Sequence, residues 1–395
     1  MRTSANDLFA DIGYMSINHD GEQLCGDHVE MVHQEDGNTN VIVLADGLGS
    51  GVKASILSTL TSKIISTMLA SGLPIEDCVE TIAATLPVCA ERHVAYSTFT
   101  IIRILNNEKA EIIQYDNPKT ILIRDGKNCE LPVTLKEIGG KQISFAETML
   151  QKDDVFIAMS DGVEHAGAGG HYNFNWKREN IIEYMENFMH VGFTAKTLST
   201  ILVNEVDSLY EGHPEDDATA CVVHISQRVP VNLLFGPPKN SDDCKKMMDL
   251  VFSKAGKHIV SGGTTAKIAA DYLGKTVCPC NMNADPTIPP MSEIDGVDLV
   301  TEGVITMDRV LKYAKDYIAD NRTYDQWSNK RDGASAISRA IFEEGTDINF
   351  FVGCAINPAH QNPNLPINFN IKKSIVEQLS DCLQQMGKRV KIIYF

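Results

Sequence analysis

The first part of the chain alternates short apolar stretches with turn-forming residues. Asn40–Ala45 is a continuous apolar run, which is typical of a buried strand. From Val52 to Ala70, apolar residues recur every four positions and Gly72 follows them, which predicts a helix. We expect one face of this helix to be apolar: it carries Val52, Ile56, Leu60, Ile64 and Met68, with Leu57, Ile65 and Leu69 beside them.

The same patterns predict further elements before residue 227. A second helix is expected over Pro74–Ala90 and a third over about Thr194–Leu209. Strands are predicted at Ser97–Ile102, Glu111–Tyr115, Thr120–Arg124, Asp154–Ser160 and Ala218–Ile225. This part of the chain is therefore rich in strands, with helices grouped in two places.

After Gln227 strands and helices alternate regularly. Such alternation favours a mostly parallel sheet with helices on both faces. We therefore expect two domains, 1–227 and 231–395, the second a three-layer α/β (Rossmann-like) domain. The predicted elements are Val231–Phe235, Asp242–Ala255, His258–Ser261, Thr264–Leu273, Val297–Val300, Met307–Ile318, Ile348–Cys354, Ile371–Gly387 and Arg389–Tyr394.

Composition limits the classes of partner. The chain has 395 residues and a formal net charge of −17, which argues against nucleic acid or an anionic membrane as the main partner. No run of eighteen apolar residues predicts a membrane span, and Met1–Asp20 does not read as an export signal. The ten cysteines are mostly scattered, so we expect reduced thiols and a cytoplasmic protein.

The strand at Asn40–Ala45 runs into Asp46 and then a glycine-rich loop. Glycines stand at 47, 49 and 51, which is neither the G-x-G-x-x-G of dinucleotide-binding loops nor a Walker loop. What remains is an aspartate at the end of a buried strand with Gly47 directly after it. A glycine there lets the backbone approach a ligand closely.

Acidic residues recur at strand edges elsewhere. The predicted strand Asp154–Ser160 runs into Asp161-Gly162, Asp216-Asp217 precedes the strand at Ala218, and Asp27 follows Gly26. Carboxylate and carbonyl oxygens are the ligands that Mg²⁺ and Mn²⁺ prefer. The repetition favours a site for divalent cations over a set of unrelated turns.

These segments, in this order, resemble the PP2C class of metal-dependent protein phosphatases, and most closely its bacterial SpoIIE-like branch. The resemblance covers about residues 10–227 and implies a PP2C-like β-sandwich flanked by helices. No resemblance is found for residues 230–395. The segments are Gly26-Asp27, Ala45–Gly51, Ser160–Glu164 and Asp216–Thr219.

The resemblance implies a site with two Mn²⁺ or Mg²⁺ ions. Asp46 would bridge both ions and the Gly47 carbonyl would bind the first. Asp161 and Asp216 would bind the second, and Asp27 would act through bound water. Asp217 would lie beside these ligands.

The implied activity is hydrolysis of phosphoserine or phosphothreonine by a metal-activated water, with Asp46, Asp161 and Asp216 as the catalytic residues. The implied substrate is a bacterial regulatory phosphoprotein, such as an anti-sigma-factor-antagonist-like protein. A catalytically weak binding or signalling module on the same scaffold is the alternative.

The second domain contains a further candidate site. Ser261-Gly262-Gly263-Thr264-Thr265 joins a predicted strand to a predicted helix, an arrangement that can bind an anion at the helix N-terminus. Glu302 ends the next strand and belongs to the same predicted edge. The domain could bind a regulatory ligand, form a homodimer, or be a nucleotide-binding enzyme centred on this loop.

Overall fold

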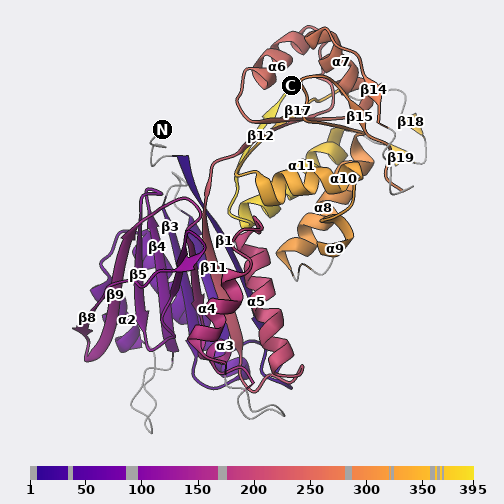
Figure 1. Cartoon of the computed structure of the whole chain (residues 1–395). Helices are drawn as coiled ribbons and strands as arrows, with labels where there is room; N and C mark the ends of the chain where they lie inside the picture. Colours follow the sequence, from indigo (N-terminus) through magenta and orange to yellow (C-terminus); the bar gives the residue numbers. More distant parts are fainter. Residues whose placement is uncertain are drawn as a thin grey trace. The chain divides into compact units, whose positions relative to one another are not determined.

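The computed structural model describes residues 7–33, 39–85, 97–167, 176–280, 287–319, 321, 324–355, 361–362, 365–366 and 369–395. The chain divides into two compact units, Met1–Gln227 and Arg228–Phe395 (Figure 1). Each unit has its own sheets and its own hydrophobic cores.

The N-terminal unit contains two antiparallel sheets. The first has the order β1-β11-β10-β6-β7 and the second β2-β3-β4-β5-β9-β8. The first sheet comprises β1 (Leu8–Ile17), β11 (Ala218–Gln227), β10 (Val155–Met159), β6 (Ile121–Arg124) and β7 (Lys127–Asn128). The second comprises β2 (Asp27–His33), β3 (Asn40–Gly47), β4 (Ser97–Leu105), β5 (Lys109–Tyr115), β9 (Lys141–Met149) and β8 (Val133–Ile138).

The two sheets pack face to face, and helices cover their outer faces. In β10, Phe156 points into the core between the sheets, whereas Ile157 packs against the helical layer that contains Leu202. This alternation follows from the two-residue period of a strand. The result is a helix–sheet–sheet–helix sandwich, as the resemblance implied. Its helices are α1 (Gly51–Ala70), α2 (Ile75–Thr85), α3 (Asp161–Glu164), α4 (Arg178–Glu186) and α5 (Ala195–Leu209).

Helix α1 forms where the spacing predicts it, but it buries only part of the predicted face. Val52, Ile56 and Leu60 are 62%, 55% and 45% exposed. Leu57 and Ile65 instead pack against the second sheet together with small Ala, Ser and Thr residues. The structure buries Leu57, Ile65 and Leu69 of the predicted face, and Ile64 and Met68 are partly buried. The prediction was wrong for Val52, Ile56 and Leu60 because apolar residues occur on both sides of this helix.

Some elements of the N-terminal unit have no clear pattern of apolar residues in the sequence. Strand β8 has exposed side chains from Val133 to Glu137, so it shows no alternation of buried and exposed positions. Neither β8, β9 nor α4 is among the predicted elements. The part of the predicted helix Pro74–Ala90 beyond Thr85 lies outside the described residues.

The C-terminal unit is built on a mostly parallel sheet, as expected. Its order is β14-β15-β16-β13-β12-β17-β20, and β16, β13, β12, β17 and β20 are parallel neighbours. These strands are β12 (Pro230–Phe235), β13 (Lys257–Ser261), β14 (Cys278–Pro279), β15 (Ser292–Glu293), β16 (Leu299–Thr301), β17 (Asp347–Val352) and β20 (Arg389–Tyr394). A separate two-stranded ladder pairs β18 (Gln361–Asn362) with β19 (Leu365–Pro366).

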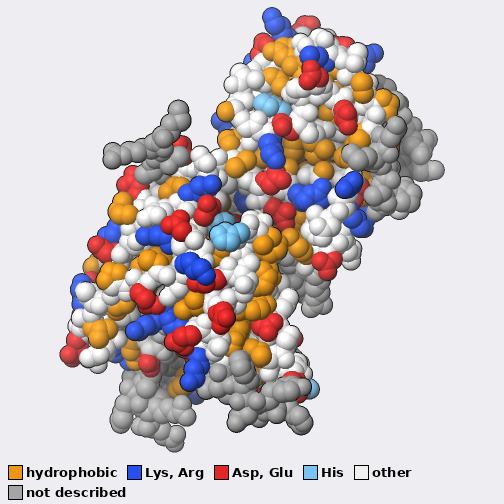
Figure 2. All heavy atoms as spheres, in the orientation of Figure 1, with side chains coloured by type: hydrophobic (Ala, Val, Ile, Leu, Met, Phe, Trp, Pro, Cys, Tyr) orange, Lys and Arg blue, Asp and Glu red, His pale blue; other side chains and the backbone are white. Residues whose placement is uncertain are grey.

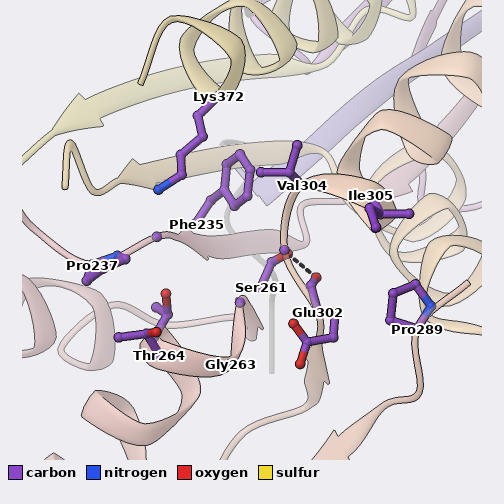
Figure 3. Close-up of a pocket in the computed structure, with 14 residues that line it drawn as sticks. Phe235, Pro237, Ser261, Gly263, Thr264, Pro289, Glu302, Val304, Ile305 and Lys372 are labelled. Carbon is purple, nitrogen blue, oxygen red and sulfur yellow. Dashed lines mark hydrogen bonds between the residues drawn. The ribbon is translucent and has the colours of Figure 1, made fainter. Parts of the chain in front are cut away.

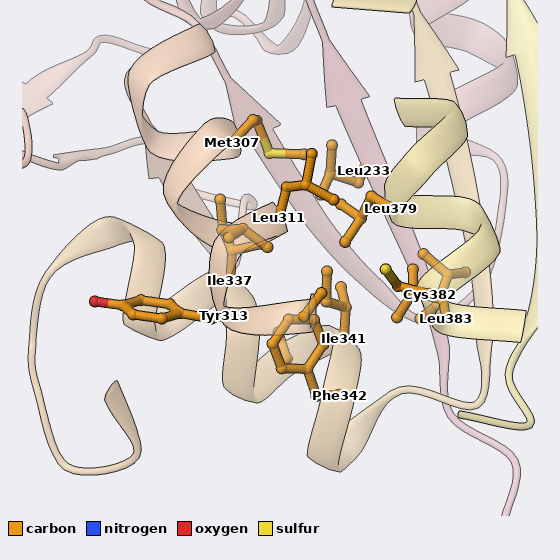
Figure 4. Packing of buried hydrophobic residues seen from close by; sticks show 14 of the residues in the cluster. Leu233, Met307, Leu311, Tyr313, Ile337, Ile341, Phe342, Leu379, Cys382 and Leu383 are labelled. Atoms are coloured by element: carbon orange, nitrogen blue, oxygen red, sulfur yellow. The ribbon is translucent and has the colours of Figure 1, made fainter. Parts of the chain in front are cut away.

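Helices cover both faces of this sheet, which gives three layers. On one face Leu233 packs with Met307, Ile341 and Leu379 (Figure 4). On the other face Leu234 joins a second core with α6 and α7. The helices are α6 (Asp243–Phe252), α7 (Gly263–Leu273), α8 (Val304–Ile318), α9 (Tyr324–Trp327), α10 (Gly333–Ser338), the π-helix η2 (Arg339–Glu344) and α11 (Phe369–Gln385).

The distribution of surface charge and the character of the helices can be compared with the partner classes considered above. On the face shown in Figure 2, basic and acidic side chains are interspersed. Among the described residues, no helix combines the length and the apolar character that crossing a membrane requires.

Candidate metal centre

Asp27 and Asp46 face each other across two neighbouring strands. Asp27 begins β2, Asp46 lies near the end of β3, and the two are direct partners in the antiparallel register. The Gly47 N–H donates to the Gly26 carbonyl oxygen over 3.2 Å and closes the ladder at this point. The Cα atoms of directly opposed residues in an antiparallel pair lie about 4.5–5.5 Å apart. The sheet itself therefore brings the residues that carry these two carboxylates together.

The remaining acidic residues come from the other sheet. Asp161 begins α3 one residue after Ser160, which follows β10, and Asp216 and Asp217 directly precede β11. Strands β10 and β11 are antiparallel neighbours, so the end of one lies beside the start of the other. The Ser160 N–H donates to the Thr219 carbonyl oxygen over 3.0 Å.

Ser160 connects the two sheets at the site. Its Oγ donates to Asp27 Oδ2 over 2.7 Å and accepts from the Thr219 N–H over 2.9 Å. Ser160 is fully buried, and Asp27 is 6% exposed. Ser160 is not among the predicted site residues, although its place directly before Asp161-Gly162 was a usable signal.

Asp217 is held at the base of the cluster. Its Oδ1 accepts the backbone N–H of His19 over 3.0 Å, and the residue is 3% exposed. A Cβ on Gly26 would lie 2.6 Å from Asp217 Oδ2, so this glycine makes room for the carboxylate. Among the described residues, Asp217 Oδ2 and Asp27 Oδ1 are buried without a hydrogen-bond partner.

The two Asp-Gly pairs are fixed by backbone packing. A Cβ on Gly47 would lie 2.2 Å from the Ala54 carbonyl oxygen in the first turn of α1. A Cβ on Gly162 would lie 2.3 Å from the Asp217 carbonyl oxygen. Only glycine fits at either position, and this fit holds Asp46 and Asp161 in place.

The cluster carries strong like-charge repulsion. Burial, and then the neighbouring carboxylates of Asp27, Asp161 and Asp216, raise the pKa of Asp46. Burial is also the largest cause that raises the pKa of Asp27, against hydrogen bonds that lower it. The pKa of Asp216 is raised by burial and by Asp161. Each of these three aspartates thus has its pKa raised both by burial and by at least two neighbouring carboxylates.

The donor set fits hard divalent cations. It consists of carboxylate oxygens, two of them buried and unpartnered, while Asp161 and Asp216 are exposed toward solvent. Within the described ranges, no three His, Cys, Asp or Glu side chains already stand at coordination spacing. The structure therefore brings the predicted residues together but leaves the assignment of individual ligands to the proposal below.

The residues of the second candidate site also come together. Ser261 ends β13, Gly262 is the N-cap of α7, and Glu302 lies between β16 and α8. The Ser261 Oγ donates to the Glu302 carbonyl oxygen over 2.8 Å (Figure 3). All six predicted residues line one pocket, together with Lys372, which the sequence analysis missed.

Comparison with known proteins gives a family match for part of the N-terminal unit. Residues 36–226 match the family model of Stage II sporulation protein E (SpoIIE), a range that includes Asp46, Asp161, Asp216 and Asp217 but not Asp27. Stage II sporulation protein E of Bacillus subtilis (strain 168) is 22% identical over 191 residues. That alignment covers 47% of this chain and 22% of the relative.

Solved structures with a similar fold include two phosphatase domains. The phosphatase domain of the cell fate determinant SpoIIE from Bacillus subtilis aligns at 20% identity and a TM-score of 0.44, covering 57% of this chain and 95% of that one. The SiaA-PP2C domain of Pseudomonas aeruginosa aligns at 16% identity and a TM-score of 0.43, covering 53% and 85%.

The family match and the order of the acidic segments agree. Residues 36–226 therefore resemble the SpoIIE family, over somewhat less than half of the chain. The chain spans about a fifth of the length of the curated relative that it matches, since the alignment covers 22% of it.

Proposed function

We propose that the N-terminal unit is a metal-dependent phosphatase that hydrolyses phosphoserine or phosphothreonine on a protein. The observation that carries this proposal is that the strand pairing and the Ser160–Asp27 hydrogen bond bring five aspartates to one end of the two sheets: Asp27, Asp46, Asp161, Asp216 and Asp217. The match of residues 36–226 to the SpoIIE family supports the same reaction class.

The proposed ligands are the residues that the sequence indicated. Asp46 and the Gly47 carbonyl would hold one ion, and Asp46, Asp161 and Asp216 the other, with Asp27 and Asp217 supporting them. Two bound Mn²⁺ or Mg²⁺ ions would lower the pKa of a water and neutralise charge that develops on the phosphoryl group.

The chain's own residues position this chemistry. The Ser160 hydroxyl fixes the orientation of Asp27, and the His19 N–H fixes that of Asp217. Asp161 and Asp216 are exposed, so a phosphoprotein in solution would have access to them. Because carboxylates repel a phosphate dianion, this edge would bind substrate only after its own charge is neutralised.

The proposed substrate is a bacterial regulatory phosphoprotein of the anti-sigma-factor-antagonist type, as the SpoIIE resemblance implies. The C-terminal unit would then serve as a regulatory or ligand-binding domain. Deleting residues 231–395 without any change in activity or metal dependence would contradict this role.

The activity is tested by following hydrolysis of p-nitrophenyl phosphate and of a phosphothreonine peptide by the full chain with Mn²⁺. We expect Asp46→Asn to lower kcat/KM by at least about a hundredfold, because it removes a charged oxygen shared by both proposed ions. EDTA should abolish the activity of the unmodified protein.

Asp153→Asn is the matched control. Asp153 lies just before β10, at the opposite end of that strand from Asp161, and its side chain is 62% exposed. This change should leave the rate within about twofold. Absence of Mn²⁺-dependent hydrolysis in the folded, unmodified protein would favour the alternative of a binding module on the same scaffold.

A further inference from the structure

The C-terminal unit contains a pocket at the carboxyl ends of three parallel strands. Strands β12, β13 and β16 end at Phe235, Ser261 and Thr301, and the residues that follow them form the pocket walls. The carboxyl edge of a parallel sheet is where open α/β folds bind ligands. The cavity holds about 170 Å³, which is less than the roughly 300–1,000 Å³ of pockets for drug-sized ligands.

The first turn of α7 forms one wall of the pocket. This helix has 11 residues and begins at Gly263, and Figure 3 shows Gly263 and Thr264 bordering the cavity. The N–H groups of the first turn have no acceptor within the helix, and the helix dipole favours an anion there. The N-terminus of α8, at Gly303 and Val304, borders the same pocket.

Thr265 gives an independent indication of a ligand. Its side chain lines the pocket and is 0% exposed, and within the described part of the chain its Oγ1 has no hydrogen-bond partner. A Cβ on Gly262 would lie 3.1 Å from this oxygen. A buried hydroxyl without a partner costs about 1–3 kcal/mol, a cost that a ligand oxygen in the pocket would remove.

Lys372 brings a buried positive charge to the opposite wall. It reaches from α11 toward the pocket (Figure 3) and is 8% exposed. Its Nζ donates to the Ala355 carbonyl oxygen over 3.1 Å and lies 2.9 Å from where a Cβ on Gly236 would stand. Burial is the main cause that lowers the pKa of this amine. No described carboxylate forms an ion pair with it.

Glu302 and apolar side chains complete the pocket. Glu302 is exposed at its edge, and its Oε1 lies 3.2 Å from where a Cβ on Gly263 would stand. Phe235, Val304 and Ile305 form apolar walls. A carboxylate in this place suits a hydroxyl group of a ligand rather than a second anionic group.

We propose that this pocket binds the phosphate group of a small hydroxyl-bearing phosphate ester. The phosphate would lie against the first turn of α7, between the Thr265 hydroxyl and Lys372, with a ligand hydroxyl at Glu302. The small cavity would enclose the phosphate and its nearest carbons and leave the rest of the ligand outside. This proposal does not depend on the phosphatase activity of the N-terminal unit.

The test is calorimetric titration of the full chain with inorganic phosphate, ribose phosphate and adenosine monophosphate. EDTA is present throughout, so that the N-terminal carboxylates repel these anions and any binding reports on the second unit. Succinate serves as a dianion without phosphorus. We expect the two esters to bind more tightly than inorganic phosphate, and succinate to bind most weakly.

Variants locate the binding site. Lys372→Met should weaken ester binding by at least about tenfold, and Thr265→Val by about threefold. Lys373→Met is the matched control, since the neighbouring Lys373 has a 47% exposed side chain that pairs with Glu377. Ser338→Ala, which removes another buried hydroxyl without a described partner, controls for loss of packing.

Several results would overturn the proposal. One is the absence of binding by every phosphate probe, and another is equal binding by the unmodified protein and Lys372→Met. Tighter binding of succinate than of the esters would exclude phosphate as the recognised group. If Lys372→Met fails to fold by circular dichroism, the nearly isosteric Thr265→Val decides, and unchanged affinity in that variant rejects the site.

Discussion

The two candidate sites leave opposite charges uncompensated. At the edge of the N-terminal sandwich, aspartates raise one another's pKa values, and His19 is the one basic group among the main causes of these shifts. In the C-terminal pocket a lysine is buried beside a helix N-terminus. The first arrangement suits cations and the second an anion, although the whole chain carries −17. Local burial therefore says more about a ligand than net charge does.

The sites also differ in how the sheets assemble them. In antiparallel sheets, strand starts and strand ends meet at one edge, so Asp27 at the start of β2 meets Asp46 near the end of β3. In the parallel sheet, Ser261 and Glu302 both follow carboxyl ends. A site on antiparallel strands can thus combine residues that precede one strand with residues that follow its neighbour. A site on parallel strands takes its residues from the loops that follow the strands.

The largest effect that separates the two sites is the pH dependence of stability. Burial and neighbouring carboxylates raise the pKa of Asp27 to about 8 and that of Asp46 to about 9. The unfolded chain releases these protons near pH 4. Without divalent cations, the free energy of unfolding contributed by these groups therefore falls as pH rises from about 4 to about 9.

Bound Mn²⁺ should remove this loss, because it replaces protons as the neutralising charge. Urea unfolding of the N-terminal unit with and without MnCl₂ measures the effect. We expect Mn²⁺ to stabilise by at least about 2 kcal/mol more near pH 8 than near pH 5. Equal stabilisation at both pH values would show that ions do not bind at the carboxylates.

A smaller effect is expected from neutralising one carboxylate. Asp27→Asn keeps an oxygen that can accept from Ser160 and removes one buried negative charge. Without cations, the free energy of unfolding of this variant near pH 8 should be about 1 kcal/mol higher than that of the unmodified protein. The same variant should gain less from Mn²⁺ in urea unfolding, and a loss of stability without cations would refute the repulsion argument.

The smallest effect is expected in the C-terminal pocket. Thr265→Val replaces an unpartnered buried hydroxyl by a methyl group, so the unliganded protein should gain up to about 1 kcal/mol. The gain should appear in the thermal unfolding of the C-terminal unit and shrink when ribose phosphate is added. A marked destabilisation would mean that the hydroxyl has a structural role.

The sequence indicated most of the acidic positions because they follow or precede a strong apolar run, whereas Asp27 follows only Gly26. Asp46 and Asp161 were recognisable as Asp-Gly pairs at strand ends, and their glycines prove necessary for close backbone contact with Ala54 and Asp217. Lys372 was not recognisable, because it is one of two adjacent lysines in a helix far along the chain. Only its burial distinguishes it from Lys373.

Periodicity and order along the chain thus determined the types of element, the alternation in the second unit and the order of the acidic segments. The tertiary structure alone decided that α1 leaves Leu60 exposed, that Ser160 joins Asp27 across two sheets, and that Lys372 lines the same pocket as the Gly262–Thr265 loop. The reason is physical: a local pattern fixes which faces a helix or strand has, whereas burial, and with it charge and pKa, depends on which distant segments pack against those faces.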